Sequence, residues 1–235
     1  MERNLLLKIS DLSSGYGEMG ILRNVSFDLR EGDITLLLGT NGSGKTTLLK
    51  TIAGLLKATS GKIIFDGKDI TGIPIAERRR LGIIFASEDT YFPTLNVKEN
   101  LVMSLGKNHE NYEEKMKEIF QYFPELREMA KSKASSLSGG QRKMLIMARA
   151  IASEGKLIVI DEPSSGLSPL FVEKIITLLE RLKNMKQTIL LAEQNVEFVS
   201  LAAEVGILDE GRIAFFGSKD NALQNDVIRK TYFSI

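Results

Sequence analysis

The chain has 235 residues, of which 43% are apolar and 26% are charged, the composition of an ordinary globular protein. Its 31 basic and 30 acidic residues leave a net charge of +1, so no overall field favours nucleic acid or an anionic membrane. The absence of cysteine excludes disulfide frameworks and thiolate metal sites. No apolar run approaches the roughly 20 residues that span a bilayer, so any membrane role must come through a partner.

Strand and helix signals alternate along the chain, as they do in an α/β protein. The first thirty residues predict two strands, 5–12 and 25–29, joined through a glycine-rich turn at Gly15, Tyr16 and Gly17. Further short aliphatic runs are nearly continuous, which is typical of a parallel sheet covered on both faces. These runs are 34–38, 62–65, 82–85, 157–160 and 188–191. We therefore expect a parallel core with a small antiparallel sheet at its N-terminal side.

The strand signal disappears between residues 88 and 151. Asn96 is a suitable cap for a helix with one apolar stripe, and a second amphipathic helix is expected to end before Pro124. The basic cluster Arg78-Arg79-Arg80 is expected to be a solvated helix end. The sequence predicts one domain, in which a helical subdomain is inserted into the α/β core. The predicted boundaries are 1–87 and 156–235 for the core, and 88–155 for the helical subdomain.

The pattern G-x-x-x-x-G-K-T begins at Gly39, directly after a predicted strand, and opens a predicted helix. This context distinguishes a phosphate-binding loop from a glycine-rich turn that binds nothing. Lys45 would reach the β- and γ-phosphates, and the Thr46 hydroxyl would bind Mg²⁺, while backbone N–H groups and the helix N-terminus surround the phosphates. The predicted nucleotide contacts of this loop are Gly39, Asn41, Gly42, Ser43, Gly44, Lys45, Thr46 and Thr47.

Asp161 ends a predicted buried strand, where an ionised carboxylate is costly unless it is bound. A magnesium ion with its waters would satisfy it, so Asp161 is a predicted metal ligand. Glu162 follows directly. The alternative for both acids is capping of the next helix, but Pro163 and the loop 164–168 intervene before a helix that starts near Pro169.

The segment Leu137-Ser138-Gly139-Gly140-Gln141 precedes a strongly helical run, 142–152. Ser138 is predicted to be the N-cap, and the glycines would leave the helix N-terminus bare for an anion. Taken alone, this segment could be only a capped helix.

The phosphate loop, the LSGGQ segment and the aliphatic run ending in Asp161-Glu162 together resemble the ATP-binding cassette (ABC) ATPases over nearly the whole chain. The resemblance implies an α/β fold: a P-loop NTPase (RecA-like) core with an N-terminal antiparallel β subdomain and an inserted α-helical subdomain. It implies ATP and Mg²⁺ as ligands, with Glu162 polarising the attacking water. It also implies that two subunits, this chain with itself or with a paralogue, sandwich two ATP molecules. The contacts to the other subunit's ATP would be Ser138, Gly139, Gly140 and Gln141.

Three further positions follow from the resemblance. Tyr16 lies where relatives stack an aromatic ring on adenine, although it could also be an ordinary aromatic residue beside a glycine turn. Most relatives have a glutamine near residue 88 that contacts Mg²⁺ and the attacking water. Counting from the preceding strand gives this catalytic and metal-binding role to Glu88, which we favour, whereas counting back from Pro93 gives it to Ser87. Where most relatives have a histidine that contacts the γ-phosphate, this chain has Gln194, whose amide donates but carries no proton.

The single histidine, His109, is expected at the surface of the helical subdomain. Glu88 and the run Glu193-Gln194-Asn195 resemble the ATPase subunits of branched-chain amino acid importers, as do the segments 120–126 and 227–233. The resemblance implies an ATP-hydrolysing subunit that drives a separate transmembrane permease, lies on the cytoplasmic face of the membrane and never touches the transported substrate.

The apolar residues Tyr91, Phe92 and Pro93 are expected to line a groove for a short permease helix, the alternative being that they cap the helical subdomain's own core. A lipopolysaccharide-export ATPase and an iron–sulfur assembly ATPase remain alternatives for the whole chain. A chromosome-maintenance ATPase is disfavoured because too few residues separate Lys45 from Ser138 for long coiled coils, and no nucleic-acid partner is expected.

Overall fold

A six-stranded sheet forms the centre of the fold in the computed structural model, which describes residues 4–105 and 112–225. The strand order is β10-β9-β3-β8-β7-β6, and all neighbours are parallel except β9 and β10. The strands are β3 (Ile34–Leu38), β6 (Ile83–Ala86), β7 (Leu157–Asp161), β8 (Thr188–Glu193), β9 (Glu204–Asp209) and β10 (Arg212–Ser218). All five predicted core runs are strands, but the run 62–65 belongs to a second sheet.

That second sheet is antiparallel, with the order β2-β1-β4-β5. Its strands are β1 (Leu5–Tyr16), β2 (Met19–Arg30), β4 (Ala58–Phe65) and β5 (Lys68–Asp69). Strand pairing continues further along the chain than predicted, because Gly15 and Tyr16 lie opposite Gly20 and Met19 within the ladder. The turn therefore consists of Gly17 and Glu18, and the predicted turn at Gly15 and Tyr16 is wrong.

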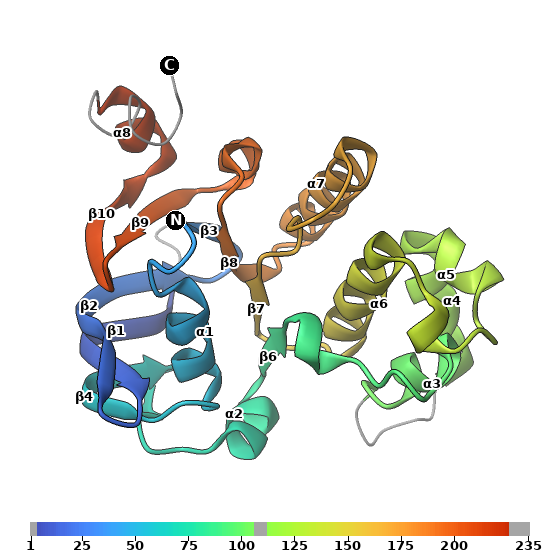
Figure 1. Ribbon diagram of the computed structural model, residues 1–235, viewed down its shortest axis with the longest axis horizontal. Coiled ribbons are helices and arrows are strands. Elements are labelled where there is room, and N and C mark those ends of the chain that lie inside the picture. Colours follow the sequence, from blue (N-terminus) through green and yellow to red (C-terminus); the bar gives the residue numbers. More distant parts are fainter. Residues whose placement is uncertain (1–3, 106–111, 226–235) are drawn as a thin grey trace.

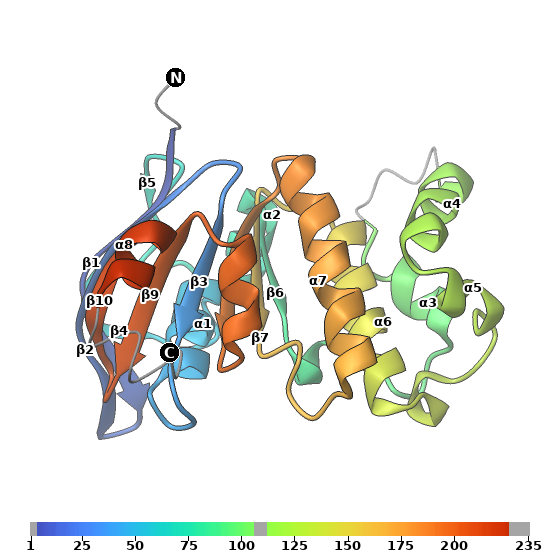
Figure 2. The same cartoon turned by 90° about the horizontal axis from the view of Figure 1, so that it is seen from above.

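Alternation along the central strands divides the apolar side chains between two cores. Leu37 of β3 joins a core that contains the antiparallel sheet and helix α1 (Lys45–Ala53), whereas Leu36 and Leu38 join a core on the other face. Helix α7 (Pro169–Asn184) and helix α6 (Gly139–Ala152) contribute to this second core. The sheet is thus covered on both faces, as its continuous apolar strands predict (Figures 1 and 2).

Four helices lie on the side of the molecule away from the antiparallel sheet (Figure 1). They are α3 (Val97–Val102), α4 (Tyr112–Tyr122), α5 (Pro124–Glu128) and α6. Asn96 caps α3 as predicted, since its side chain accepts from the backbone N–H of Glu99, and the carboxylate of Glu99 accepts from the N–H of Asn96. His109 and the segment 227–233 lie outside the described residues.

The sequence analysis did not predict the hairpin of β9 and β10 or the helix α8 (Lys219–Gln224) that follows it. The sequence held a signal for the hairpin, because Glu210 and Gly211, both with positive φ, separate two apolar runs. In the described part of the chain, no helix is both long and apolar enough to cross a bilayer.

The expectation of a solvated arginine cluster is wrong for Arg78, on helix α2 (Ile75–Leu81), which is only 2% exposed. Its guanidinium donates to the carbonyls of Thr51 and Ile52, both at 2.8 Å, at the C-terminal end of α1. A cation there is favoured by the negative end of the helix dipole and by the carbonyls that face out of the last turn. Burial lowers the pKa of Arg78 to about 10.

Candidate active site

Four of the polar segments predicted to act on a nucleotide follow the carboxyl ends of neighbouring strands. The phosphate loop follows β3, the Glu88 segment follows β6, Asp161 and Glu162 end or follow β7, and Gln194 follows β8. Since β3, β8, β7 and β6 are adjacent and parallel, these ends meet at one edge of the sheet. The topology therefore brings four distant segments to one place.

The phosphate loop includes Gly44, which has φ of +106° and would place a Cβ 3.1 Å from the side chain of Leu22, so a larger residue would be strained there. Gly44 is also the N-cap of α1 and supplies no side-chain cap, and the first turn holds no acid. The first N–H groups of α1 and the positive end of its dipole are therefore available to an anion.

Lys45 is only 4% exposed and lies inside this loop. Its ammonium donates to the carbonyls of Gly39 at 2.7 Å and Thr40 at 3.1 Å, and it pairs with the carboxylate of Glu162 at 3.0 Å. The loop thus holds the lysine with local carbonyls, and the catalytic candidate Glu162 supplies the opposite charge.

In the described residues, every buried side-chain oxygen that lacks a hydrogen-bond partner lies at this edge of the sheet. These atoms are Ser43 Oγ, Ser87 Oγ and Asp161 Oδ1. Buried polar groups in folded proteins are normally paired, so three such atoms at one edge of the sheet indicate a place for a polar ligand or ion.

The carboxyl group of Asp161 has the environment of a metal ligand. Burial raises its pKa, against the hydrogen bond from the side chain of Thr46, which lowers it. A hydroxyl and a carboxylate in contact are oxygen donors of the kind that Mg²⁺ prefers, and one or two protein ligands suffice because this ion keeps several waters. Thr46 and Asp161 therefore fit the predicted ion.

Glu162 has φ of +45°, a left-handed conformation that residues other than glycine seldom adopt. The conformation is held by a hydrogen bond of 2.9 Å from its N–H to the carbonyl of Ala192 in β8. The left-handed conformation turns the chain sharply after Asp161. The two successive acids therefore occupy different places in the site. Such strain is commonly found at functional sites.

Glu193 is a buried acid that the sequence analysis did not select as a site residue. Its carboxylate accepts from the backbone N–H groups of Ser164 at 2.8 Å, Gln194 at 3.0 Å and Asn195 at 3.3 Å. One side chain thus fixes both the loop after Glu162 and the loop of Gln194. The same signal that selected Asp161, an acid at the end of an apolar strand, could have found it.

Gln194 itself is exposed and lines a cavity of about 350 Å³ together with Asn41 and Glu162. The structure therefore brings Gln194 to the same space as the phosphate loop and the candidate base. Residues 138–141 are not among the lining of this cavity in the described part of the chain.

Glu88 and Ser87 are both brought beside Asp161, with which they line a small cavity. The carboxylate of Glu88 is 73% exposed and pairs with Lys143 of α6 at 2.9 Å. Ser87 is buried, with its hydroxyl unpaired. The assignment of the metal-side role to Glu88 stays a prediction.

The LSGGQ segment opens α6, with Ser138 as its N-cap as predicted. The Ser138 hydroxyl accepts from the N–H of Gln141 at 3.3 Å, and the Gln141 side chain accepts from the N–H of Ser138 at 2.9 Å. A Cβ on Gly140 would lie 2.7 Å from the ring of Phe171, whereas one on Gly139 would meet nothing within 4 Å. Gly140 thus permits packing against α7, and Gly139 leaves the helix N-terminus open.

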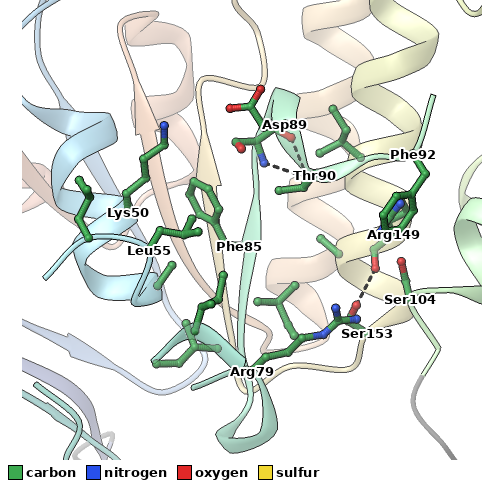
Figure 3. A pocket seen from close by; sticks show the side chains of 18 of the residues that line it. Lys50, Leu55, Arg79, Phe85, Asp89, Thr90, Phe92, Ser104, Arg149 and Ser153 are labelled. Atoms are coloured by element: carbon green, nitrogen blue, oxygen red, sulfur yellow. Dashed lines mark hydrogen bonds between the residues drawn. The ribbon is translucent and has the colours of Figure 1, made fainter. Parts of the chain in front are cut away.

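A larger cavity, of about 530 Å³, lies where α1, α2 and β6 face α6 (Figure 3). Apolar side chains such as Leu55 and Phe92 line it together with Arg79 and Arg149. Tyr16 also lines this cavity and is half exposed, so an aromatic surface is available at the end of β1. Its predicted contact with adenine stays a prediction.

Phe92 lies at the side of this cavity and is 41% exposed, whereas Tyr91 packs against the core. The ring of Phe92 lies 4.6 Å from the guanidinium of Arg149. The side chain of Asn100 accepts from the backbone N–H of Phe92 and donates to its carbonyl, each at 2.8 Å. Arg149 in turn donates to Asn100 at 2.7 Å. Burial, followed by the nearby charge of Arg79, lowers the pKa of Arg149 to about 10.

Comparison with known proteins agrees with this geometry. The model of the ABC transporter family matches residues 22–165. The chain belongs to this family, and it is an ATPase subunit with the P-loop NTPase fold predicted from its motifs.

Among its relatives, the chain is similar to a probable branched-chain amino acid transport ATP-binding protein LivF of Archaeoglobus fulgidus, with 38% identity over 98% of this chain and 99% of the relative. It is 34% identical to the high-affinity branched-chain amino acid transport ATP-binding protein BraG of Pseudomonas aeruginosa, over 97% and 99%. The lipopolysaccharide export system ATP-binding protein LptB of Escherichia coli is 30% identical over 96% of each chain. A solved ATP-binding cassette of an ABC transporter superimposes with a TM-score of 0.85 at 29% identity, covering 97% of this chain and 99% of that one.

Proposed function

We propose that this chain hydrolyses MgATP in a dimer of cassettes and thereby drives a separate permease that imports branched-chain amino acids. The observation that carries the proposal is the meeting of Lys45, Thr46, Asp161 and Glu162 at one edge of the central sheet, beside a bare helix N-terminus. Positioning and charge stabilisation are what phosphoryl transfer requires of a protein.

Each residue has a definite task in this proposal. The loop N–H groups and Lys45 bind the phosphates, and Lys45 exchanges the carboxylate of Glu162 for phosphate oxygens. Thr46 and Asp161 would hold Mg²⁺, which when bound neutralises charge on the phosphates. Once Lys45 has released it, the Glu162 carboxylate accepts a hydrogen bond from the attacking water and orients that water. Gln194 donates a neutral hydrogen bond to the γ-phosphate.

Two observations support a second cassette: among the described residues, 138–141 do not line the cavity beside Glu162, and a Cβ on Gly139 would meet nothing within 4 Å. The open helix N-terminus is suited to an anion. We propose that it completes the site of a second subunit, which is either this chain or a paralogue.

The permease is proposed to bind at the cavity around Phe92. This cavity is largely apolar and lies beside the Glu88 segment, so an inserted helix would touch the metal side of the site. Contact through this face would hold the subunit on the cytoplasmic side of the membrane, away from the transported substrate. No nucleic acid takes part in the proposal.

The substrate class rests on the relatives. Those named for branched-chain amino acid transport are 38% and 34% identical to this chain, whereas the lipopolysaccharide-export relative is 30% identical. Lipopolysaccharide export is therefore the second candidate function, since the same architecture serves it.

The test is reconstitution of the chain in liposomes with the permease and the substrate-binding protein of a branched-chain amino acid importer. We expect ATP-dependent uptake of leucine, isoleucine or valine, and none with Lys45→Ala, which serves as the inactive control. ATP hydrolysis without uptake of any of the three would refute the substrate class alone. Absence of Mg²⁺-dependent ATP hydrolysis would refute the proposed function as a whole.

A further inference from the structure

Lys143 is a buried lysine on the LSGGQ helix that contacts two segments of the central sheet's active edge. Its side chain is 8% exposed. The ammonium donates to the backbone carbonyl of Glu162 at 2.8 Å, and it pairs with the carboxylate of Glu88 at 2.9 Å. One cation of α6 thus contacts both the residue after β7 and the segment that follows β6.

The two partners of the ion pair differ in their exposure to solvent, because the side chain of Glu88 is 73% exposed and that of Lys143 is buried. Water can solvate Glu88 without Lys143, whereas a buried ammonium needs an oxygen partner to offset its lost hydration. Lys143 is therefore the fixed member, and the position of the Glu88 carboxylate depends on it.

The position that Lys143 gives to Glu88 is at the metal side of the site. Glu88, Lys143 and Asp161 line the same small cavity, and Asp161 Oδ1 there has no hydrogen-bond partner. We propose that Lys143 is a positioning residue, which holds the Glu88 carboxylate beside Asp161 and makes that placement depend on the orientation of α6. The inference rests on the proposed function in two respects, the binding of Mg²⁺ by Asp161 and the contact of Gly139 with a second subunit's nucleotide.

Under this proposal, Gly139 at the start of α6 and Lys143 about one turn further along move together. Lys143 lies within the first two turns of α6, which begins at Gly139. A shift of α6 when Gly139 meets the second subunit's phosphate would move Lys143, and with it Glu88. Lys143 thereby makes the metal side of one site sensitive to engagement at the other.

The first experiment measures the Mg²⁺ concentration for half-maximal ATP hydrolysis, together with the KM for ATP. Lys143→Met should raise that Mg²⁺ concentration about tenfold while the KM for ATP stays within about twofold, as expected for a residue that positions a metal-side group. Glu88→Ala should match it, and the double variant should be no worse than either. Lys143→Arg keeps the positive charge and should return the Mg²⁺ concentration for half-maximal hydrolysis to near that of the wild type. The control is Lys156→Met, which removes an exposed ion pair with Asp66 and should leave both constants unchanged.

The second experiment needs neither nucleotide nor metal, so its result is independent of the proposed function. The chain has no cysteine, so spin labels attached at Lys68→Cys on β5 and Glu128→Cys on α5 report the distance between the antiparallel sheet and the helices. Lys143→Met should shift or broaden that distance by on the order of 2 Å, the scale of helix shifts, and Lys156→Met should not.

An unchanged distance distribution in Lys143→Met would overturn the proposed dependence on α6. Unchanged Mg²⁺ dependence, or additive losses in the double variant, would overturn the positioning of Glu88. A protein that shows the distance shift but hydrolyses no ATP would instead contradict the proposed function and leave the tie between Lys143 and α6 standing.

Discussion

The phosphate loop and the junction between β6 and α6 each contain a nearly buried lysine, and they hold it in different ways. Lys45 donates to the carbonyls of Gly39 and Thr40, which belong to its own loop, and takes only Glu162 from elsewhere. Lys143 has both of its oxygen partners, from Glu162 and Glu88, in other segments of the chain. The loop is thus assembled by local chain geometry, whereas the junction exists only where α6 meets the sheet.

The difference predicts which region can adjust. The loop is bound into a sheet with a buried core on both faces, so its geometry is fixed before any ligand arrives. The junction contains the exposed carboxylate of Glu88 and the half-exposed ring of Phe92, which lies at a cavity. Both side chains can move at little cost in free energy. We therefore expect changes in the loop to abolish the chemistry, and changes in the junction to alter its control.

The largest effect is expected from Glu162→Gln, which tests the carboxylate that pairs with the loop lysine, Lys45. Turnover should fall by about 10²–10⁴-fold, because the water loses its oriented acceptor. ATP affinity should persist or rise, since the variant removes the charge that competes with phosphate for Lys45. Phosphate release and nucleotide titration measure the two effects, and size-exclusion chromatography in ATP should show a stable dimer. Hydrolysis near that of the wild type would refute the assignment of Glu162.

Lys45→Ala tests whether the loop lysine binds nucleotide or only stabilises the loop. ATP affinity should fall about hundredfold, because hydrogen bonds to a charged acceptor contribute about 1.5–3 kcal/mol each. Titration with a fluorescent ATP analogue gives the affinity, and thermal unfolding of the same samples checks that the loop remains folded. Unaltered affinity in a folded variant would contradict a role for Lys45 at the phosphates.

Gln194→Ala should slow hydrolysis by about 10–100-fold, since one neutral donor to the γ-phosphate would be lost. The variant should be slow but not inactive, unlike Glu162→Gln. Gln194→His provides the matched comparison, because an imidazole at this place should preserve the activity or raise it. Full activity of Gln194→Ala would mean that the side chain points away from the nucleotide.

Phe92→Ala is expected to have the smallest effect on basal ATP hydrolysis, and it tests the junction rather than the phosphate loop. Basal ATP hydrolysis should stay within about twofold of the wild type, while permease binding and transport fall. The free energy of unfolding should decrease by about 0.5–1 kcal/mol, the contribution of an exposed ring over a guanidinium. Tyr91→Ala, which removes a ring packed on the core, should cost more stability. Parallel loss of stability and basal hydrolysis in Phe92→Ala would favour a purely structural role.

Much of the site was predictable because local patterns encode it. The G-x-x-x-x-G-K-T run after an apolar strand predicted the loop and α1, and an acid ending another apolar strand predicted Asp161 at the sheet edge. The N-caps at Asn96 and Ser138 followed from side chains that bond within three residues. Arg78 was predicted wrongly because its partners lie at the end of a different helix.

The sequence by itself determined the family and the parallel sheet, and it predicted the phosphate-binding residues, since each depends on periodicity or on spacing within one short segment. Only the tertiary structure decided that Glu193 fixes two loops, that Arg149 and Asn100 hold Phe92 at a cavity, and that Lys143 joins Glu88 to the LSGGQ helix. The contacts of Glu193 with Ser164, of Arg149 with Asn100 and of Lys143 with Glu88 connect segments far apart in the chain. Their partners become neighbours only when the order of the strands, which no local pattern specifies, places the strand ends side by side.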